Sequence, residues 1–189
     1  MIKVFLILFA LVFSLTGCVG ADYIEPENRA LITALIIDST ENYEITAEVI
    51  NVKDKTNEGL IPPEYLSGKG NNLKNAFTDL QKNYSKNLSL YHCPLIVCQN
   101  DIYINDFETL YGFISENSQI SLAANLVVLD NCTNLIEKAC DNVDTVGYKI
   151  SEQIELKGIQ TKIIDIMRNK TSPAQLLLED EEVIVSKNE

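Results

Sequence analysis

The sequence predicts an α+β (mixed α/β) fold, in which a β-hairpin start is followed by alternating helices and strands around one central sheet. Three observations support this class. Two strand-like segments follow one another directly after residue 28. From residue 73 onward, segments of helical periodicity alternate with short apolar segments. Internal repeats and low-complexity tracts are absent from the sequence. A hairpin start also argues against a doubly wound nucleotide-binding fold.

The hairpin comprises two segments of different pattern. Residues 29–39 (RALITALIIDS) form a nearly continuous apolar run, which predicts a strand buried on both faces. STENYE supplies turn residues, and residues 45–52 (ITAEVINV) alternate as in a half-buried strand. One face would carry Ile45, Ala47 and Val49, and the other Thr46, Glu48 and Ile50. Residues 53–72 contain two prolines and several glycines and are predicted as a loop.

A helix is predicted to begin near Leu73, with Asn71 or Asn72 as its cap. Its apolar residues recur every three or four positions: Leu73, Ala76, Phe77, Leu80, Tyr84 and Leu88. Residues 88–99 (LSLYHCPLIVCQ) return to a strand pattern, opened by a short extended segment before Pro94.

The second half of the chain repeats this alternation less regularly. Asn105 or Asp106 would cap a helix, and residues 120–130 (ISLAANLVVLD) form an apolar strand. Asn131 would cap a short helix, and residues 156–167 suggest another, which Pro173 ends. The inward residues of these three helices would be Phe107, Leu110, Tyr111 and Ile114, then Leu135, Ile136 and Ala139, then Ile159, Ile163, Ile166 and Met167. An acidic run at 179–182 precedes VIVS, a candidate closing strand.

The first 17 residues have the pattern of a lipoprotein signal peptide. Lys3 precedes an apolar run from Val4 to Leu15, too short to cross a bilayer, which needs about 20 apolar residues. Leu15, Thr16, Gly17 and Cys18 then form a bacterial lipobox, with cleavage between Gly17 and Cys18. Small residues suit a peptidase groove, and the Cys18 thiol would accept diacylglycerol. We therefore expect a signal peptide at 1–17, a lipidated N-terminus and spacer at 18–28, and one domain at 29–189.

Composition restricts the partners of this domain. The signal peptide removes one of the 15 Lys and Arg residues, so 14 cations face 27 acids and the formal charge falls to −13. Such a surface repels nucleic-acid phosphates and anionic headgroups. We expect no nucleic-acid binding, and we expect the lipid on Cys18 to provide the membrane attachment, on the outer face of the cell membrane.

Four cysteines remain after Cys18, and their spacing favours buried free thiols. Cys93 and Cys98 would flank a single short strand, and Cys132 and Cys140 lie two turns apart on a helix. Neither local pair is well placed for a disulfide, although a cross pairing stays open. A metal site at His92, Cys93 and Cys98 would lack both a CxxC motif and a second histidine, so we expect no metal.

The remaining candidates for chemistry have simpler interpretations. Asp38 and Asp130 each end a strand, so they could share a sheet edge, but strand-terminal aspartates usually bond to turn amides. His92 is the only histidine and is predicted in the core or at an interface. Gly68-Lys69-Gly70 lacks the spacing of a phosphate loop and is predicted to be a flexible approach to the following helix. We expect no catalytic residues and no cofactor.

The lipobox is followed by the acidic spacer DYIEPENR, the strand ALITALIIDS and its partner YEITAEVINV. This order of segments resembles the N-terminal domain of the Ger(x)C family of spore germination lipoproteins, and the likeness extends over about residues 15–180. It continues through SGKGNNLKNAFTDLQKNYSKNLSLYHCPLIVCQNDI and FETLYGFISENSQISLAANLVVLDNCTNLIEKA. Gly70 and His92 stand where the family has a glycine before the helix and a histidine opening the next strand.

The resemblance implies a subunit of a nutrient germinant receptor. Family members are about twice as long, so the likeness is to the N-terminal domain only. It implies a non-catalytic scaffold or signalling role beside the multi-spanning A and B subunits, at the spore inner membrane. The alternatives from the residues alone are an extracytoplasmic small-ligand-binding lipoprotein, which needs a deep pocket, and an envelope hydrolase, which needs a nucleophile–base pair or a metal triad.

Overall fold

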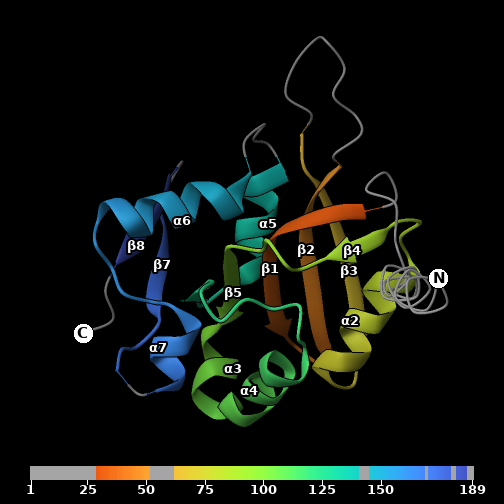
Figure 1. Ribbon diagram of the computed structural model, residues 1–189, viewed down its shortest axis with the longest axis horizontal. Coiled ribbons are helices and arrows are strands. Elements are labelled where there is room, and N and C mark those ends of the chain that lie inside the picture. Colours follow the sequence, from red (N-terminus) through yellow and green to blue (C-terminus); the bar gives the residue numbers. More distant parts are fainter. Residues whose placement is uncertain (1–28, 52–61, 141–144, 169, 180–181, 187–189) are drawn as a thin grey trace, which may run out of the picture.

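The computed structural model describes residues 29–51, 62–140, 145–168, 170–179 and 182–186 (Figure 1). The predicted signal peptide and spacer lie outside these ranges. The strands are β1 (Arg29–Ser39), β2 (Tyr43–Asn51), β3 (Glu64–Gly70), β4 (Asn87–Ser89), β5 (Leu95–Gln99), β6 (Asn125–Leu129), β7 (Ala174–Glu179) and β8 (Glu182–Ser186). The helices are α2 (Leu73–Lys82), α3 (Asn100–Asn105), α4 (Phe107–Glu116), α5 (Cys132–Cys140), α6 (Val146–Leu156) and α7 (Ile163–Met167).

One mixed sheet runs through the domain in the order β3-β2-β1-β5-β6-β7-β8, and β4 pairs with β1 beside the start of β5. The four central strands β1, β5, β6 and β7 are parallel. Strands β2 and β3 on one side and β8 on the other are antiparallel to their neighbours. The predicted α+β class with a hairpin start and one central sheet is confirmed.

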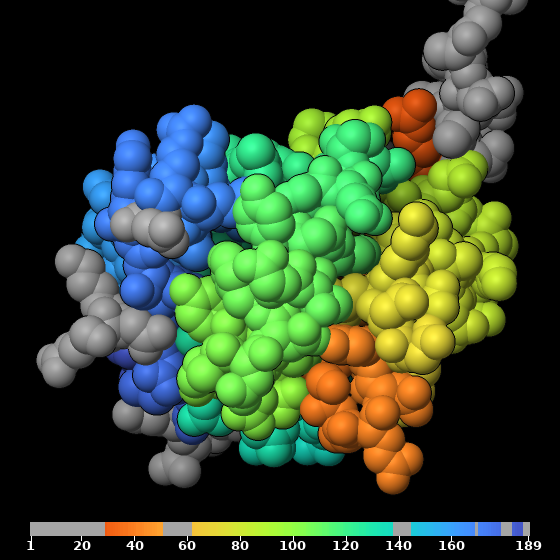
Figure 2. All heavy atoms as spheres, turned by 90° about the horizontal axis from the view of Figure 1, so that it is seen from below, coloured from red at the N-terminus to blue at the C-terminus, as the bar shows by residue number. Residues whose placement is uncertain are grey.

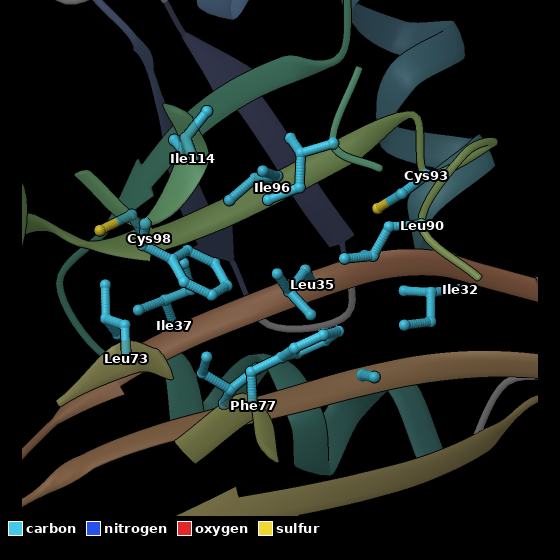
Figure 3. Close-up of a cluster of buried hydrophobic side chains, with 14 of the residues drawn as sticks. Ile32, Leu35, Ile37, Leu73, Phe77, Leu90, Cys93, Ile96, Cys98 and Ile114 are labelled. Atoms are coloured by element: carbon cyan, nitrogen blue, oxygen red, sulfur yellow. The ribbon is translucent and has the colours of Figure 1, made fainter. Parts of the chain in front are cut away.

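Helices cover both faces of the sheet and enclose two hydrophobic clusters. Residues of α2, α3, α4 and α7 pack on the first face, and residues of α5 and α6 pack on the second. Figure 1 shows α3, α4 and α7 at the bottom of the view and α5 and α6 at the top. In the first cluster, Leu35 of β1 lies beside Phe77 of α2, and Ile96 of β5 lies on the other side of Leu35 (Figure 3). The large helices therefore divide into two layers around one sheet.

The predicted hairpin is correct, and its second strand is more buried than expected. Strand β1 is buried on both faces, and β2 pairs with it antiparallel. Ile45, Ala47 and Val49 join the first cluster as predicted. The prediction of a half-buried strand is wrong, because Thr46 is only 2% exposed and Glu48 is fully buried on the opposite face.

The loop predicted for residues 53–72 contains a strand. Residues 64–70 form β3, which pairs with β2 over its whole length, while residues 53–61 lie outside the described ranges. Gly68-Lys69-Gly70 belongs to this strand and is not a flexible approach. The glycines are there because α2 crosses the strand closely: a Cβ on Gly68 would lie 2.2 Å from the Leu80 amide nitrogen.

Helix α2 begins where predicted and ends early. The Asn72 side chain accepts a hydrogen bond from the Asn75 amide at 2.8 Å, which confirms this residue as the cap. The helix ends at Lys82, so Leu88 does not continue it and lies in β4. The extended segment before Pro94 and the strand after it are confirmed as β4 and β5.

The second half of the chain departs most from the prediction. Helix α3 was not anticipated, and Tyr111 on α4 is 42% exposed and does not face inward. The strand predicted from residue 120 begins only at Asn125. Most of helix α6 lies in a segment for which the sequence predicted no element. Residues 156–167 are not one helix, because Gly158 has φ +62° and separates α6 from α7. The Asn131 cap of α5 is confirmed by a 3.3 Å bond from the Asn134 amide, and the closing strand is confirmed as β8.

Candidate functional site

The predicted lipidation residue Cys18 and cleavage residue Gly17 lie outside the described residues, so both stay predictions. Among the helices that the structure describes, none has the length and apolar character that crossing a bilayer requires. The candidate sites inside the domain are therefore the strand-end carboxylates, the histidine, the cysteines, a buried glutamate and two grooves.

Asp38 and Asp130 lie at the same edge of the sheet but form no common site. Asp38 is the penultimate residue of β1, and Asp130 follows β6. The two strands run parallel with β5 between them, so about 10 Å separates their ends. Asp38 Oδ1 accepts the Ser39 amide at 2.8 Å, and Asp130 Oδ1 accepts Asn100 Nδ2 at 3.1 Å. Asp38 bonds to the next backbone amide, as strand-terminal aspartates usually do, whereas Asp130 bonds to the side chain of Asn100 at the start of α3.

His92 and the cysteine beside it do not form a catalytic pair. The His92 side chain is exposed in the turn before Pro94, so its prediction as a core residue is wrong, and an interface role stays a prediction. The next residue, Cys93, is 4% exposed and faces the first hydrophobic cluster. His92 and Cys93 lie in the short turn between β4 and β5, and this turn leaves the His92 imidazole exposed to solvent.

Cys93, Cys98 and Cys132 are free and buried, as the spacing predicted. Burial raises the pKa of the Cys93 and Cys98 thiols to about 12 and also raises that of Cys132. A buried thiol that stays protonated is a poor nucleophile and packs as a small hydrophobic side chain. The side chain of Cys140 lies outside the described residues. Within the described ranges, no three His, Cys, Asp or Glu residues cluster as a metal site would require.

The most unusual polar group is Glu48, a fully buried carboxylate on β2 that the sequence analysis assigned to a solvent-facing side. Its Oε1 accepts the Val146 amide at 2.7 Å, and its Oε2 accepts the Gly147 amide at 2.9 Å. Thr33 and Tyr65 each donate a hydroxyl to it at 2.6 Å. Four hydrogen bonds therefore hold this carboxylate, which is what a buried charge requires.

Glu48 takes the place of a helix cap. Thr145, the residue before α6, makes no side-chain capping bond, so the first amides of the helix need another acceptor. A carboxylate at this position also interacts favourably with the helix dipole. The sheet shifts register between Ile32 and Ala34, and at this bulge Thr33 donates to Glu48. The arrangement fixes α6 to the sheet and leaves no acceptor lone pair for a substrate.

Glu48 also belongs to a polar ladder between β2 and β3. Three directly paired positions interact: Glu44 with Lys69 at 3.0 Å, Thr46 with Ser67 at 2.7 Å, and Glu48 with Tyr65 at 2.6 Å. Such cross-strand pairs stabilise the edge of a sheet. One signal in the sequence could have indicated the ladder. Because β1 is predicted to be buried on both faces, the strand paired with it should also be partly covered on both faces.

A further polar contact joins the hairpin to the helices at the same end of the sheet. The Tyr43 hydroxyl donates to Asp106 Oδ2, and Thr109 Oγ1 donates to Asp106 Oδ1 at 2.6 Å. These two bonds lower the pKa of the Asp106 carboxyl, and the bond to Asp106 raises the pKa of Tyr43. Asp106 lies between α3 and α4, so the contact holds this helical pair against the hairpin.

Two surface grooves complete the candidate sites. One, of about 360 Å³, lies between α2 and α4 and includes Lys74, Phe77 and Gln119. The other, of about 650 Å³, lies between α3–α4 and the segment from α7 to Ser172. Both lie between helices at the surface, and neither adjoins the Glu48 carboxylate.

These features define a three-layer α+β domain whose buried and strand-end carboxylates bond to its own backbone and side chains. Residues 22–178 match the family described as "Spore germination protein N-terminal domain". The chain belongs to this family of spore germination proteins, and the sequence-based recognition is confirmed. No curated protein and no solved structure gave a significant match to the chain.

Proposed function

We propose that this chain is a lipid-anchored component of a spore nutrient-germination receptor, acting as a non-catalytic scaffold or signalling subunit. The observation that carries the proposal is the family match, which extends over residues 22–178 and therefore over nearly all the described domain. The polar contacts support a non-catalytic role, because Glu48, Asp38 and Asp130 are engaged with groups of the domain itself.

The proposed anchor is diacylglycerol on Cys18, and the proposed domain comprises residues 29–189. Two acyl chains give a stable attachment where a single chain gives a marginal one. Residues 18–28, even fully extended, reach at most about 40 Å, so the domain would stay near the outer face of the membrane. That location, proposed as the spore inner membrane, would place it beside multi-spanning A and B receptor subunits.

The anchor is tested by metabolic labelling with an alkyne fatty acid and by membrane fractionation. We expect the wild-type chain to carry the label and to sediment with membranes. Cys18→Ala should abolish the label, because no other residue has the lipobox context. Cys140→Ala is the matched control and should be labelled like the wild type. A label that persists in Cys18→Ala would contradict the anchor.

The receptor role is tested by deleting the gene and measuring spore germination with nutrients. We expect germination by at least one nutrient to be lost, while a trigger that bypasses nutrient receptors still works. Re-expression of the wild-type chain should restore the response. Unchanged nutrient germination for every nutrient tested would reject this role.

A further inference from the structure

The helical pair α3–α4 exposes an apolar surface. Ile104 is 64% exposed and Tyr111 is 42% exposed, although both are large hydrophobic side chains. Between them lies Phe107, whose ring centroid is 5.5 Å from that of Tyr103 and 6.2 Å from that of Tyr111. We call Tyr103, Ile104, Phe107 and Tyr111 the aromatic ridge. Figure 2 shows α3 and α4, in green, at the centre of this face of the molecule.

The ridge forms one wall of the larger groove. Tyr103, Ile104 and Phe107 line it on one side, and Ile166 lines it too. The opposite wall is polar and contains Thr171, whose hydroxyl oxygen is buried without a hydrogen-bond partner in the described part of the chain. A buried hydroxyl without a partner is costly. The groove thus offers space for an apolar side chain and an unused polar atom beside it.

The charged side chains on the two helices of the ridge have one sign. Residues 100–118 contain Asp101, Asp106, Glu108 and Glu116 and no Lys or Arg. Asp101 and Glu108 are exposed, and neither makes an ion pair among the described residues. Arg168 and Lys170 are exposed on the α7 side, and Lys170 lines the groove opposite the ridge. The exposed surface of α3 and α4 beside the groove is therefore both apolar and acidic, and Lys170 is the charged residue in the lining of the groove itself.

This charge selects among the possible occupants. A second copy of the chain would bring its own acidic surface, since the net charge is −12, and like charges across an interface are unfavourable. An anionic bilayer would be repelled for the same reason. A protein segment with Lys or Arg beside an apolar anchor would instead gain ion pairs and cation–π contacts with the tyrosines.

We propose that the aromatic ridge and its groove bind a cationic segment of a partner protein, with an apolar side chain of that segment in the groove. Asp101 and Glu108 would pair with its Lys or Arg residues. The proposal deepens the proposed function by naming a partner surface, and it rests on that function only for the extracytoplasmic location.

The test is site-specific photo-crosslinking of the full chain in the cells that carry it. The photoreactive residue p-benzoylphenylalanine replaces Ile104 in one chain, and it replaces Leu156 in a matched control. Leu156 is 80% exposed on α6, on the opposite side of the sheet. We expect a crosslink from position 104 to one protein, at a segment that mass spectrometry shows to contain Lys or Arg beside apolar residues, and no such product from position 156.

Charge-reversal variants test the recognition chemistry. Asp101→Lys with Glu108→Lys should lower the crosslink yield about tenfold, because two attractive pairs become repulsive. Glu152→Lys with Glu155→Lys on α6 makes the same change in net charge and should leave the yield unchanged. All four residues are exposed, so these variants should fold.

Several outcomes would overturn the proposal: a crosslink to a second copy, a crosslink to lipid, no crosslink at position 104, or a yield that charge reversal leaves unchanged. Failure of the proposed function is recognised separately. Absence of the fatty-acid label on Cys18 with a persistent crosslink would reject the anchor and keep this surface.

Discussion

At the scale of single residues, Glu48 connects three parts of the fold. It lies on β2, accepts a hydroxyl from Thr33 on β1, and accepts amides from the first turn of α6. Because all four of its bonds are to protein groups, removing the carboxylate leaves several buried donors without an acceptor. The interaction that fixes α6 therefore depends on one side chain.

We expect Glu48→Ala to lower the free energy of unfolding by about 3 kcal/mol or more, because the amides of Val146 and Gly147 lose their acceptor. Urea denaturation followed by circular dichroism measures this loss. Glu44→Ala is the control: its carboxylate pairs with Lys69 at the surface, so the cost should be about 1 kcal/mol or less. Equal losses for the two variants would contradict the capping role.

The buried thiols give a prediction that depends on pH. With pKa values of about 12, Cys93 and Cys98 are almost fully protonated at pH 8, with a thiolate fraction of roughly one in ten thousand. We expect iodoacetamide to leave both unmodified in the folded protein, and their reactivity to rise only as the pH approaches 12. Peptide mass spectrometry identifies the modified residues, and unfolding in urea should make both reactive at pH 8. Rapid modification of either in the folded protein would show that it is accessible.

Residue-level prediction from the sequence succeeded where the contact is local. The side chains of the caps Asn72 and Asn131 each accept a hydrogen bond from the amide three residues later, so the local sequence is enough to predict them. Glu48 bonds to residues 98 and 99 positions away, and no local pattern reports such a distance. The exposure of His92 likewise depends on the turn geometry before Pro94.

At the scale of elements, Gly147 determines how closely α6 approaches the sheet. A Cβ at this position would lie 1.9 Å from the Thr33 carbonyl oxygen, which belongs to the backbone and cannot turn away. The helix therefore packs against β1 through the bare backbone of Gly147, and its first turn reaches the Glu48 carboxylate for that reason.

Two glycines within helices should respond to alanine in opposite directions. Gly147→Ala should destabilise the domain by at least about 3 kcal/mol, since α6 must move away from Thr33. Gly112→Ala on α4 should stabilise it by about 0.5–1 kcal/mol, because a Cβ there meets nothing within 4 Å and alanine favours helix. Thermal unfolding of the two variants measures the sign. A neutral Gly147→Ala would show that the close approach does not matter.

Two physical causes account for the elements that the sequence did not predict. Strand β3 contains Gly68 and Gly70, which are usually read as loop residues, yet here they admit α2 against the strand. The short helix α3 and the interruption at Gly158 lie within one or two turns of other elements, where periodicity is too short to resolve. Tertiary contact therefore decides β3, whereas the short length of the segments explains why α3 and the interruption at Gly158 were not predicted.

At the scale of the whole molecule, the class of fold was predictable because apolar segments as long as residues 29–39 can be assigned as buried strands from their pattern alone. The strand order was not predictable, since it depends on which face each crossover takes. The exposure of Tyr111 was also not predicted, because this residue has helical spacing with the core residues of α4. Periodicity identifies a helix but does not reveal where a neighbouring layer ends.

The two hydrophobic clusters share one sheet, so we expect them to unfold together. Leu110 lies in the first cluster and Ile150 in the second, and both are at most 1% exposed. Leu110→Ala and Ile150→Ala should each cost about 2–5 kcal/mol. Each should shift the same single transition, because loss of either layer exposes a face of β1, β5 and β6. Urea unfolding followed by both near- and far-ultraviolet circular dichroism tests this. Two separate transitions, each sensitive to one variant only, would show two independent units and contradict the single domain proposed for residues 29–189.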